Sequence, residues 1–222
     1  MKIESPMPLS DNEKIIRFLD NDGFMKTTDI SKPTFKLSPI ENFVKMESKR
    51  KDGIADKNEG SVSLMNGVSK NCNDLLISCW SVYPSEEKEF LCSFIKLYEA
   101  TKDEDGKHKN FAIVSTVGEV RKVISNSINS HIYHGMVRYY SENNRFEHGD
   151  NWHYDDEQSM LSYAEAFYKT DNYSHQKEYR FLIDKPKDTL TIDESGIISL
   201  IGCEYILKKY FLCKKMTIHF LY

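Results

Sequence analysis

Three polar side chains recur at every second position of the stretch YSHQKEYRFLI, which runs from Tyr173 to Ile183. In a strand, Gln176, Glu178 and Arg180 would share one face, because alternate side chains of a strand point the same way. An amide and a carboxylate two positions apart at a strand edge can hold a sugar hydroxyl beside an electrophilic carbon. The alternative is an exposed strand on which Glu178 and Arg180 only solvate one face. Composition alone leaves both interpretations open.

Other sequence patterns exclude several kinds of chemistry. The chain contains no Gly-x-x-x-x-Gly-Lys loop, no Gly-x-Gly-x-x-Gly fingerprint and no Gly-x-Ser-x-Gly elbow, so the enzyme classes built on these motifs are excluded. His148 and His153 flank Asp150, but the Asn, Gly and Asp residues around them are typical of a surface loop. The five cysteines are an odd number without a Cys-x-x-Cys pair. We therefore expect no metal site and no disulfide framework.

Charge and hydropathy limit the partners and the location. The net charge is -4, with 30 Lys and Arg against 34 Asp and Glu, so no broad basic field exists for extended non-specific DNA binding. A small binding patch, and a protein or nucleic-acid acceptor, remain open. No apolar stretch is long and continuous enough to span a bilayer, and the N-terminus lacks the apolar core of a signal peptide. We expect a cytoplasmic protein without a membrane partner.

Hydrophobic patterning indicates how these residues are positioned. Strands are predicted in the early and middle parts of the chain at Lys14 to Asp20, Thr34 to Leu37, Leu75 to Trp80, Phe111 to Ser115 and Ile132 to Tyr140. The segments KEYRFLI, DTLTI, IISLIG and MTIHFLY supply further strands. Helices are predicted after Pro84, after Thr116, where Glu119 completes a capping box, and over the segment EQSMLSYAEAFYK.

The order of these elements predicts one α+β domain over residues 1–222, with a mixed or mainly antiparallel sheet flanked by helices. A length of 222 residues with 40% hydrophobic content is sufficient for one proper core. Residues 47–73 are rich in Lys, Asp, Asn, Gly and Ser without periodicity. They are predicted to form a mobile insertion in that domain.

The segments IIRFLD, FKLSPIENF, LISCWS, FAIVSTVGEV, GMVRYY and FYKTDNYSHQKEYRFLI occur in an order that resembles a bacterial family. This is the domain of unknown function catalogued as number twenty-nine seventy-one, some of whose members are linked to abortive phage resistance. The chain departs from the family where IENFVK lacks an Asp-Pro pair, at Ile95 where a tryptophan is usual, and at Gln176 where an acid is common. The family implies a fold more than an activity.

A second resemblance is to mono-ADP-ribosyltransferases, whose Arg, Ser and Glu motifs follow in this chain order. Arg17 lies in an early predicted strand, Ser78 and Ser81 in a middle one, and Gln176-x-Glu178 in a late one. The resemblance implies that NAD is the substrate, that Arg17 grips its phosphates, and that Ser78, Ser81 and Arg180 complete its pocket. Glu178 would bond the ribose hydroxyl and Gln176 would orient the acceptor. Ser115 is a rival for the serine, and Glu13 also allows Arg17 to lie on a helix.

Two classes of function therefore remain open. One is an NAD-consuming transferase or glycohydrolase acting as a toxin or phage-defence effector. The other is a non-catalytic protein that binds a partner or senses a signal on the same scaffold. The enzyme class requires that Arg17, a serine and Glu178 converge on one cleft.

Overall fold

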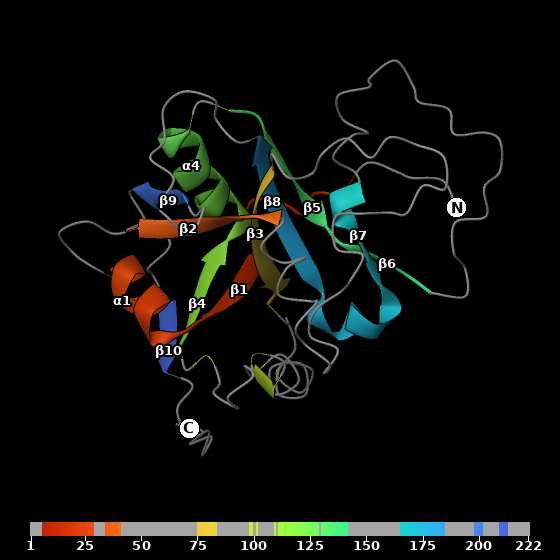
Figure 1. Cartoon of the computed structure of the whole chain (residues 1–222), viewed down its shortest axis with the longest axis horizontal. Helices are drawn as coiled ribbons and strands as arrows, with labels where there is room; N and C mark the ends of the chain where they lie inside the picture. Colours follow the sequence, from red (N-terminus) through yellow and green to blue (C-terminus); the bar gives the residue numbers. More distant parts are fainter. Residues whose placement is uncertain are drawn as a thin grey trace.

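The structure is a computed structural model that describes residues 6–28, 34–40, 75–83, 98–99, 101, 109, 111–128, 130–141, 165–184, 198–201 and 209–212. Its largest feature is an eight-stranded sheet in which every pair of neighbours is antiparallel. Six strands follow the order β10 (Lys209–Leu212), β4 (Phe111–Thr116), β1 (Lys14–Leu19), β3 (Leu75–Val82), β2 (Thr34–Pro39) and β9 (Ile198–Ile201). The other two are β8 (Glu178–Asp184), which pairs with β3, and β5 (Ile132–Met136), which pairs with β8 (Figure 1).

Strand β3 is where the sheet divides. Along one edge it pairs with β8 from Leu75 to Ser81. Along the other edge its start pairs with β2, while its end, at Ser81 and Val82, pairs with β1. The strands β1 and β2 therefore share one edge of β3 at different heights, and a seam separates them.

The two faces of the sheet are buried by different elements. Helix α4 (Val117–Ser127) lies over one face and buries Val117, Val120, Val123 and Ile124 there (Figure 1). The same cluster includes Tyr179, Phe181 and Ile183 from β8. Each of these side chains is fully buried, which is worth roughly 1.5 to 3 kcal/mol for a large apolar group.

The opposite face is covered near β8 by a short irregular segment. It consists of the 3-10 helix η3 (Glu165–Phe167), strand β7 (Tyr168–Thr170) and the 3-10 helix η4 (Asp171–Gln176). Strand β7 pairs in parallel with β6 (Arg138–Tyr140), which makes a separate two-stranded ribbon. Ala166 and Phe167 pack with Ile77 and Leu182, so residues 165–176, the cover segment, form a lid on this side of β8.

The predicted α+β class with a mainly antiparallel sheet is confirmed, as are the strands that the sequence placed at β1 to β5, β8 and β9. The capping box is also confirmed, because the Thr116 side chain accepts a hydrogen bond from the Glu119 backbone N–H and the Glu119 side chain accepts one from the Thr116 backbone N–H. It fixes the start of α4 directly after β4. The strand predicted from Ile132 to Tyr140 is interrupted at Val137, where β5 ends and β6 begins.

Other predictions were wrong or lie outside the described residues. The helix predicted over EQSMLSYAEAFYK is replaced at 165–169 by η3 and the start of β7. Helix α1 (Asn21–Thr28) and strand β10 were not predicted. The insertion at 47–73 is outside the described part of the chain, as is most of the helix after Pro84, of which Tyr98 and Glu99 are described and helical. No helix among the described residues is long and apolar enough to cross a membrane.

Candidate functional site: a buried ion network at the start of β8

The chain enters β8 through a tight reversal at Lys177. This residue has a left-handed backbone with φ 41° and ψ 52°, which is uncommon for a residue with a side chain. The reversal ends η4 at Gln176 and starts the strand at Glu178. The prediction that Gln176 shares strand alternation with Glu178 is therefore wrong, because Gln176 belongs to the preceding 3-10 helix.

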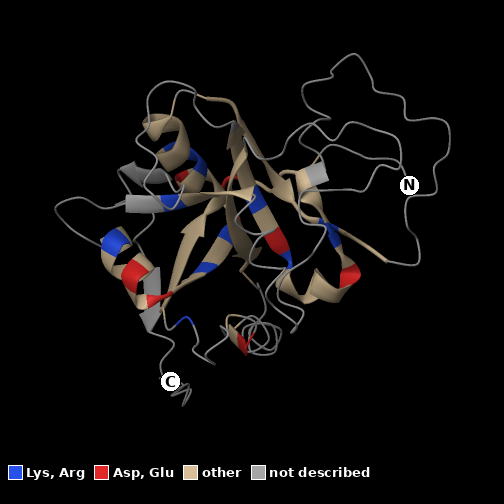
Figure 2. Cartoon of the chain, viewed as in Figure 1, with Lys and Arg blue, Asp and Glu red and all other residues tan. Residues whose placement is uncertain are grey.

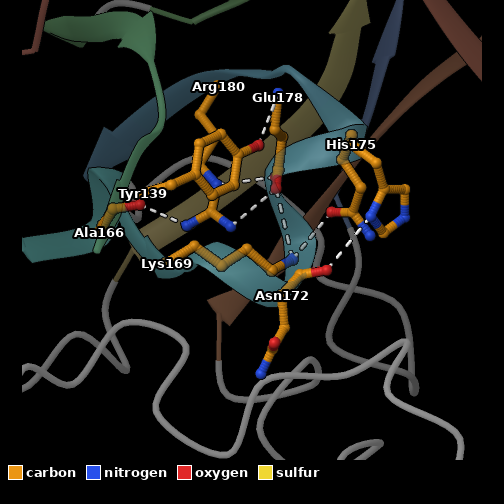
Figure 3. A network of polar contacts seen from close by, with 8 residues as sticks. Tyr139, Ala166, Lys169, Asn172, His175, Glu178 and Arg180 are labelled. Atoms are coloured by element: carbon orange, nitrogen blue, oxygen red, sulfur yellow. Dashed lines mark hydrogen bonds and ion pairs between the residues drawn. The ribbon is translucent and has the colours of Figure 1, made fainter. Parts of the chain in front are cut away.

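Glu178 is the centre of a network of polar contacts (Figure 3). Its Oε1 accepts a hydrogen bond of 2.7 Å from Nε of Arg180, and its Oε2 accepts one of 3.1 Å from Nη2 of the same guanidinium. Nζ of Lys169 lies 3.4 Å from Oε2. Exposed fractions are 4% for Glu178, 0% for Arg180 and 4% for Lys169. The interpretation of an exposed strand with solvating charges is therefore wrong.

The cover segment brings the remaining partners. Nζ of Lys169, on β7, also donates to Oε1 of Gln176 at 3.1 Å and lies 4.6 Å from the ring centre of Tyr173. Arg180 donates through Nη1 to the backbone oxygen of Ala166. Gln176 therefore reaches Glu178 through Lys169 and not as a neighbour on the strand. In this way the network ties η3, β7 and η4 to the strand beneath them.

The network keeps Glu178 ionised. Burial alone would raise the pKa of its carboxyl, but the charges of Arg180 and Lys169, with hydrogen bonds from Arg180 and Cys79, lower the pKa to about 2. Burial and the negative charge of Glu178 raise the pKa of Tyr139 to about 12. The protonated Tyr139 hydroxyl accepts the backbone N–H of Glu178 at 2.9 Å. A carboxylate with this pKa is a weak general base at neutral pH, and both its oxygens already accept hydrogen bonds from cations.

Strand pairing places two β3 side chains on the same face as this network. Ser81 is paired with Glu178 and Cys79 with Arg180, and directly paired residues of antiparallel strands project to one face. In Figure 2, acidic and basic positions alternate at this end of β8. Of the residues predicted from the sequence, the structure thus brings together Gln176, Glu178 and Arg180 and places Ser81 beside them.

Arg17 and Ser78 lie on the opposite face of the sheet. Ile16 is paired with Ser81, so Arg17, one position on, faces away from Glu178. Nη1 of Arg17 donates to the backbone oxygen of Lys36 at 3.1 Å and to Oγ of Ser78 at 2.9 Å. The same hydroxyl accepts Nε1–H of Trp80 at 2.9 Å. Arg17 is on a strand, as predicted, but the expected convergence of Arg17 and Glu178 on one cleft does not occur.

The position of Arg17 has a structural reason. Lys36 is on β2 and Arg17 on β1, the two strands that diverge along the edge of β3. A strand carbonyl beside such a seam lacks the neighbour that would complete its ladder, and an arginine can supply the donor. The guanidinium of Arg17 therefore joins β1, β2 and β3 across the seam. Ser115, the rival serine, is on β4 and donates to the Glu119 side chain at 3.0 Å.

Sequence analysis missed Lys169 and Tyr139 as members of the network. Lys169 stands in FYKTDNY, directly upstream of the QKEYR run, and this nearness was its signal. Nothing in the sequence around Tyr139 indicates that it belongs to the network, because its position next to β8 depends on the pairing of β6 with β7. Among the described residues no group of His, Cys, Asp and Glu could hold a metal ion, and His148 and His153 are outside them.

Comparison with known proteins gave no matching family model, no matching curated protein and no matching solved structure.

Proposed function

We propose that this chain is a non-catalytic binding or sensing protein in which the Glu178 network is structural. The observation that carries the proposal is the separation of Arg17 from Glu178. The two groups face opposite sides of the sheet, and each is held by bonds within the protein. A dinucleotide bridging them would have to pass through β3, so the Arg and Glu cannot act together on one NAD molecule.

The electrostatics of Glu178 support the same proposal. A carboxylate that stabilises a developing positive charge on a ribose works best when its own charge is not already compensated. Here Arg180 and Lys169 both lie within 3.4 Å of its oxygens, which cancels most of the field that a substrate would feel. A buried carboxylate bound in this way serves to hold the cover segment on β8.

NAD turnover tests this proposal directly. Purified protein incubated with NAD, with and without a cell lysate as a source of acceptors, is expected to release no nicotinamide above the level of a buffer control. Glu178→Gln is the matched variant, because glutamine has the same shape as glutamate without its charge. Circular dichroism checks that the variant is folded. Nicotinamide release by the wild type that is lost in a folded Glu178→Gln protein would overturn the proposal.

A second candidate function is favoured by one specific observation, the pairing of Ser81 with Glu178. A serine beside an ionised glutamate, with Gln176 close by, retains part of the Ser and Glu arrangement of ADP-ribosyltransferases. Under this proposal the chain consumes NAD without Arg17. Nicotinamide release would then fall on Ser81→Ala and on Glu178→Gln but stay unchanged on Arg17→Met, a pattern that a structural network does not predict.

A further inference from the structure

A cavity of about 180 Å³ opens beside β5, away from the Glu178 network. Its walls are the strand residues from His131 to His134, together with Phe167 and the N-terminal residues Pro6 and Pro8. None of the residues of the Glu178 network lines it. The cavity is thus a separate feature. Its strand, β5, is the far strand of the β3–β8–β5 ladder (Figure 1).

The N-terminal wall is fixed in place by close backbone packing. The backbone N–H of Met136 donates to the oxygen of Met7 at 3.0 Å, which makes an isolated bridge between the two segments. Gly135 allows this approach, because a Cβ there would lie only 2.6 Å from Cβ of Pro6. Pro6 and Pro8 therefore lie against β5 as a preformed wall.

The size and lining of the cavity fit a single aromatic ring. An apolar cavity of roughly 150 Å³ holds one benzene molecule. The walls are two prolines, one isoleucine and the rings of Phe167, Tyr133 and the two histidines. Aromatic rings prefer offset or edge contacts with such rings, and His131 and Tyr133 already make an edge contact at 4.5 Å.

His134 adds one directional hydrogen-bond donor to this lining. Its Nδ1 lies 2.6 Å from the hydroxyl of Tyr179. Burial raises the pKa of Tyr179 to about 12, although a hydrogen bond with the Leu9 backbone acts to lower it, so the hydroxyl keeps its proton. Burial, with the charges of Arg121 and His131, lowers the pKa of His134 despite the opposing charge of Asp11, so this ring is neutral. We assign the Tyr179 hydroxyl as the donor to Nδ1 of His134, because a phenol O–H is a stronger donor than the N–H of a neutral imidazole.

An Nδ1 that accepts a hydrogen bond leaves the proton of a neutral imidazole on Nε2. Nε2 makes no hydrogen bond within the described residues, and it is not among their fully buried polar atoms without a partner. His134 thus offers an N–H donor to whatever enters the cavity. Its ring is held by the stacked ring of Phe181, with centroids 5.8 Å apart.

We propose that this cavity binds a small aromatic compound carrying a carbonyl or hydroxyl oxygen, with the ring between Pro8 and Phe167 and the oxygen accepting Nε2–H of His134. The proposal rests on the proposed binding function and names its ligand class. The same chemistry is presented by a tyrosine side chain of a partner protein. We assign the free compound, and a tyrosine-containing peptide is the competing ligand in the titration below.

The test is a titration of isotope-labelled full-length protein with benzamide, followed by NMR. We expect saturable shifts of the backbone amides from Ile132 to His134 and of Phe167, with a dissociation constant of about 1 mM, as is usual for one small ring. Cyclohexanecarboxamide has the same size and the same acceptor but no aromatic ring, and it should bind roughly tenfold more weakly. A short peptide with one tyrosine distinguishes the other source: tighter binding by the peptide than by benzamide would overturn the assignment to a free compound.

Two variants test the donor. His134→Phe keeps a ring against Phe181 but has no N–H, and it should weaken benzamide binding roughly tenfold. Asn126→Ala, at an exposed position of α4 that does not line the cavity, is the control and should change binding less than threefold. The nitrogen shifts of His134 in the unmodified protein give a readout that needs no variant: an Nδ1–H tautomer, or absent amide shifts at 10 mM benzamide, would overturn the proposal.

The outcomes separate this proposal from the function on which it rests. NAD turnover together with benzamide binding at β5 would overturn the proposed non-catalytic function but support the cavity as a ligand site. The absence of both NAD turnover and benzamide binding would overturn the cavity as a ligand site but leave the proposed non-catalytic function intact.

Discussion

Arg17 and Arg180 lie on the two strands that flank β3, yet they contact different kinds of acceptor. Arg180 is fully buried and donates to the carboxylate of Glu178 and to one backbone oxygen. Arg17 is half-buried and donates to a backbone oxygen and a serine hydroxyl. A cation without access to water requires an anion beside it, whereas one at the protein surface can be satisfied by neutral acceptors.

The comparison assigns different roles to the two arginines. Around Glu178, three ionised side chains from β7 and β8 depend on one another, so removing one leaves the others uncompensated. At the Arg17 seam, the bonds to the Lys36 oxygen and the Ser78 hydroxyl are to neutral groups, and the loss of one is a local defect. The following predictions test whether the two regions differ in this way and whether they are independent.

The largest expected effect is that of Glu178→Ala. This change leaves the guanidinium of Arg180 and the ammonium of Lys169 buried beside an empty space, and breaking a buried pair by removing one partner costs about 3 to 5 kcal/mol. We expect a loss of unfolding free energy in this range, measured by urea denaturation. Glu178→Gln keeps the volume and one acceptor oxygen and should lose less. Equal losses for the two variants would show that the charge, and not the side-chain volume, is what the cluster needs.

Acid should weaken the same cluster by a smaller amount, since protonation keeps the side chain in place. The pKa of Glu178 is about 2 in the folded protein, below its ordinary value of 4.5, so the folded state favours the ionised form. Its contribution to stability is complete above pH 4.5 and is lost as the pH falls toward 2. The difference in unfolding free energy between the wild type and Glu178→Gln should therefore shrink between pH 4.5 and 2. A constant difference over that range would contradict an ionised Glu178.

Only part of the Glu178 and Arg180 arrangement is predictable from the sequence. Alternation in KEYRFLI was enough to predict a strand with Glu178 and Arg180 on one face, because that depends only on the two-residue period. Burial of the pair was not predictable in the same way. It depends on the cover segment, whose 3-10 turns lack a hydrophobic period. It also depends on the left-handed backbone at Lys177, a conformation that the sequence would indicate only through a glycine or asparagine at that position.

The failure to place Arg17 has a different physical origin. The sequence showed that Arg17 and Ser78 belong to strands, and it gave the order of those strands along the chain. Which face each side chain occupies relative to Glu178 depends on the register of β1 and β8 against β3, and a shift of one residue exchanges the faces. The register is set by contacts across the whole sheet, so a motif in chain order could not reveal that its members are on opposite sides.

Arg17→Met should have an intermediate effect. Methionine keeps the apolar stem but removes two hydrogen bonds. The Lys36 oxygen is exposed to water and Ser78 keeps its bond from Trp80, so the expected net loss is about 0.5 to 1.5 kcal/mol per hydrogen bond. Urea denaturation measures the loss, and Arg17→Lys, which reaches one acceptor, should recover part of it. A loss as large as that of Glu178→Ala would contradict the distinction between the two arginines.

The smallest expected effect is the coupling between the two regions, measured by combining Arg17→Met with Glu178→Gln. The strands β1 and β8 are two strand spacings apart, roughly 10 Å, and their side chains project from opposite faces of the sheet. The contacts that hold Arg17 and those that hold Glu178 involve different residues. Losses at sites so separated add to within about 0.5 kcal/mol. A coupling of more than about 1 kcal/mol would mean that the sheet transmits strain between its faces, and the arginine and the glutamate would then act as one site despite their separation.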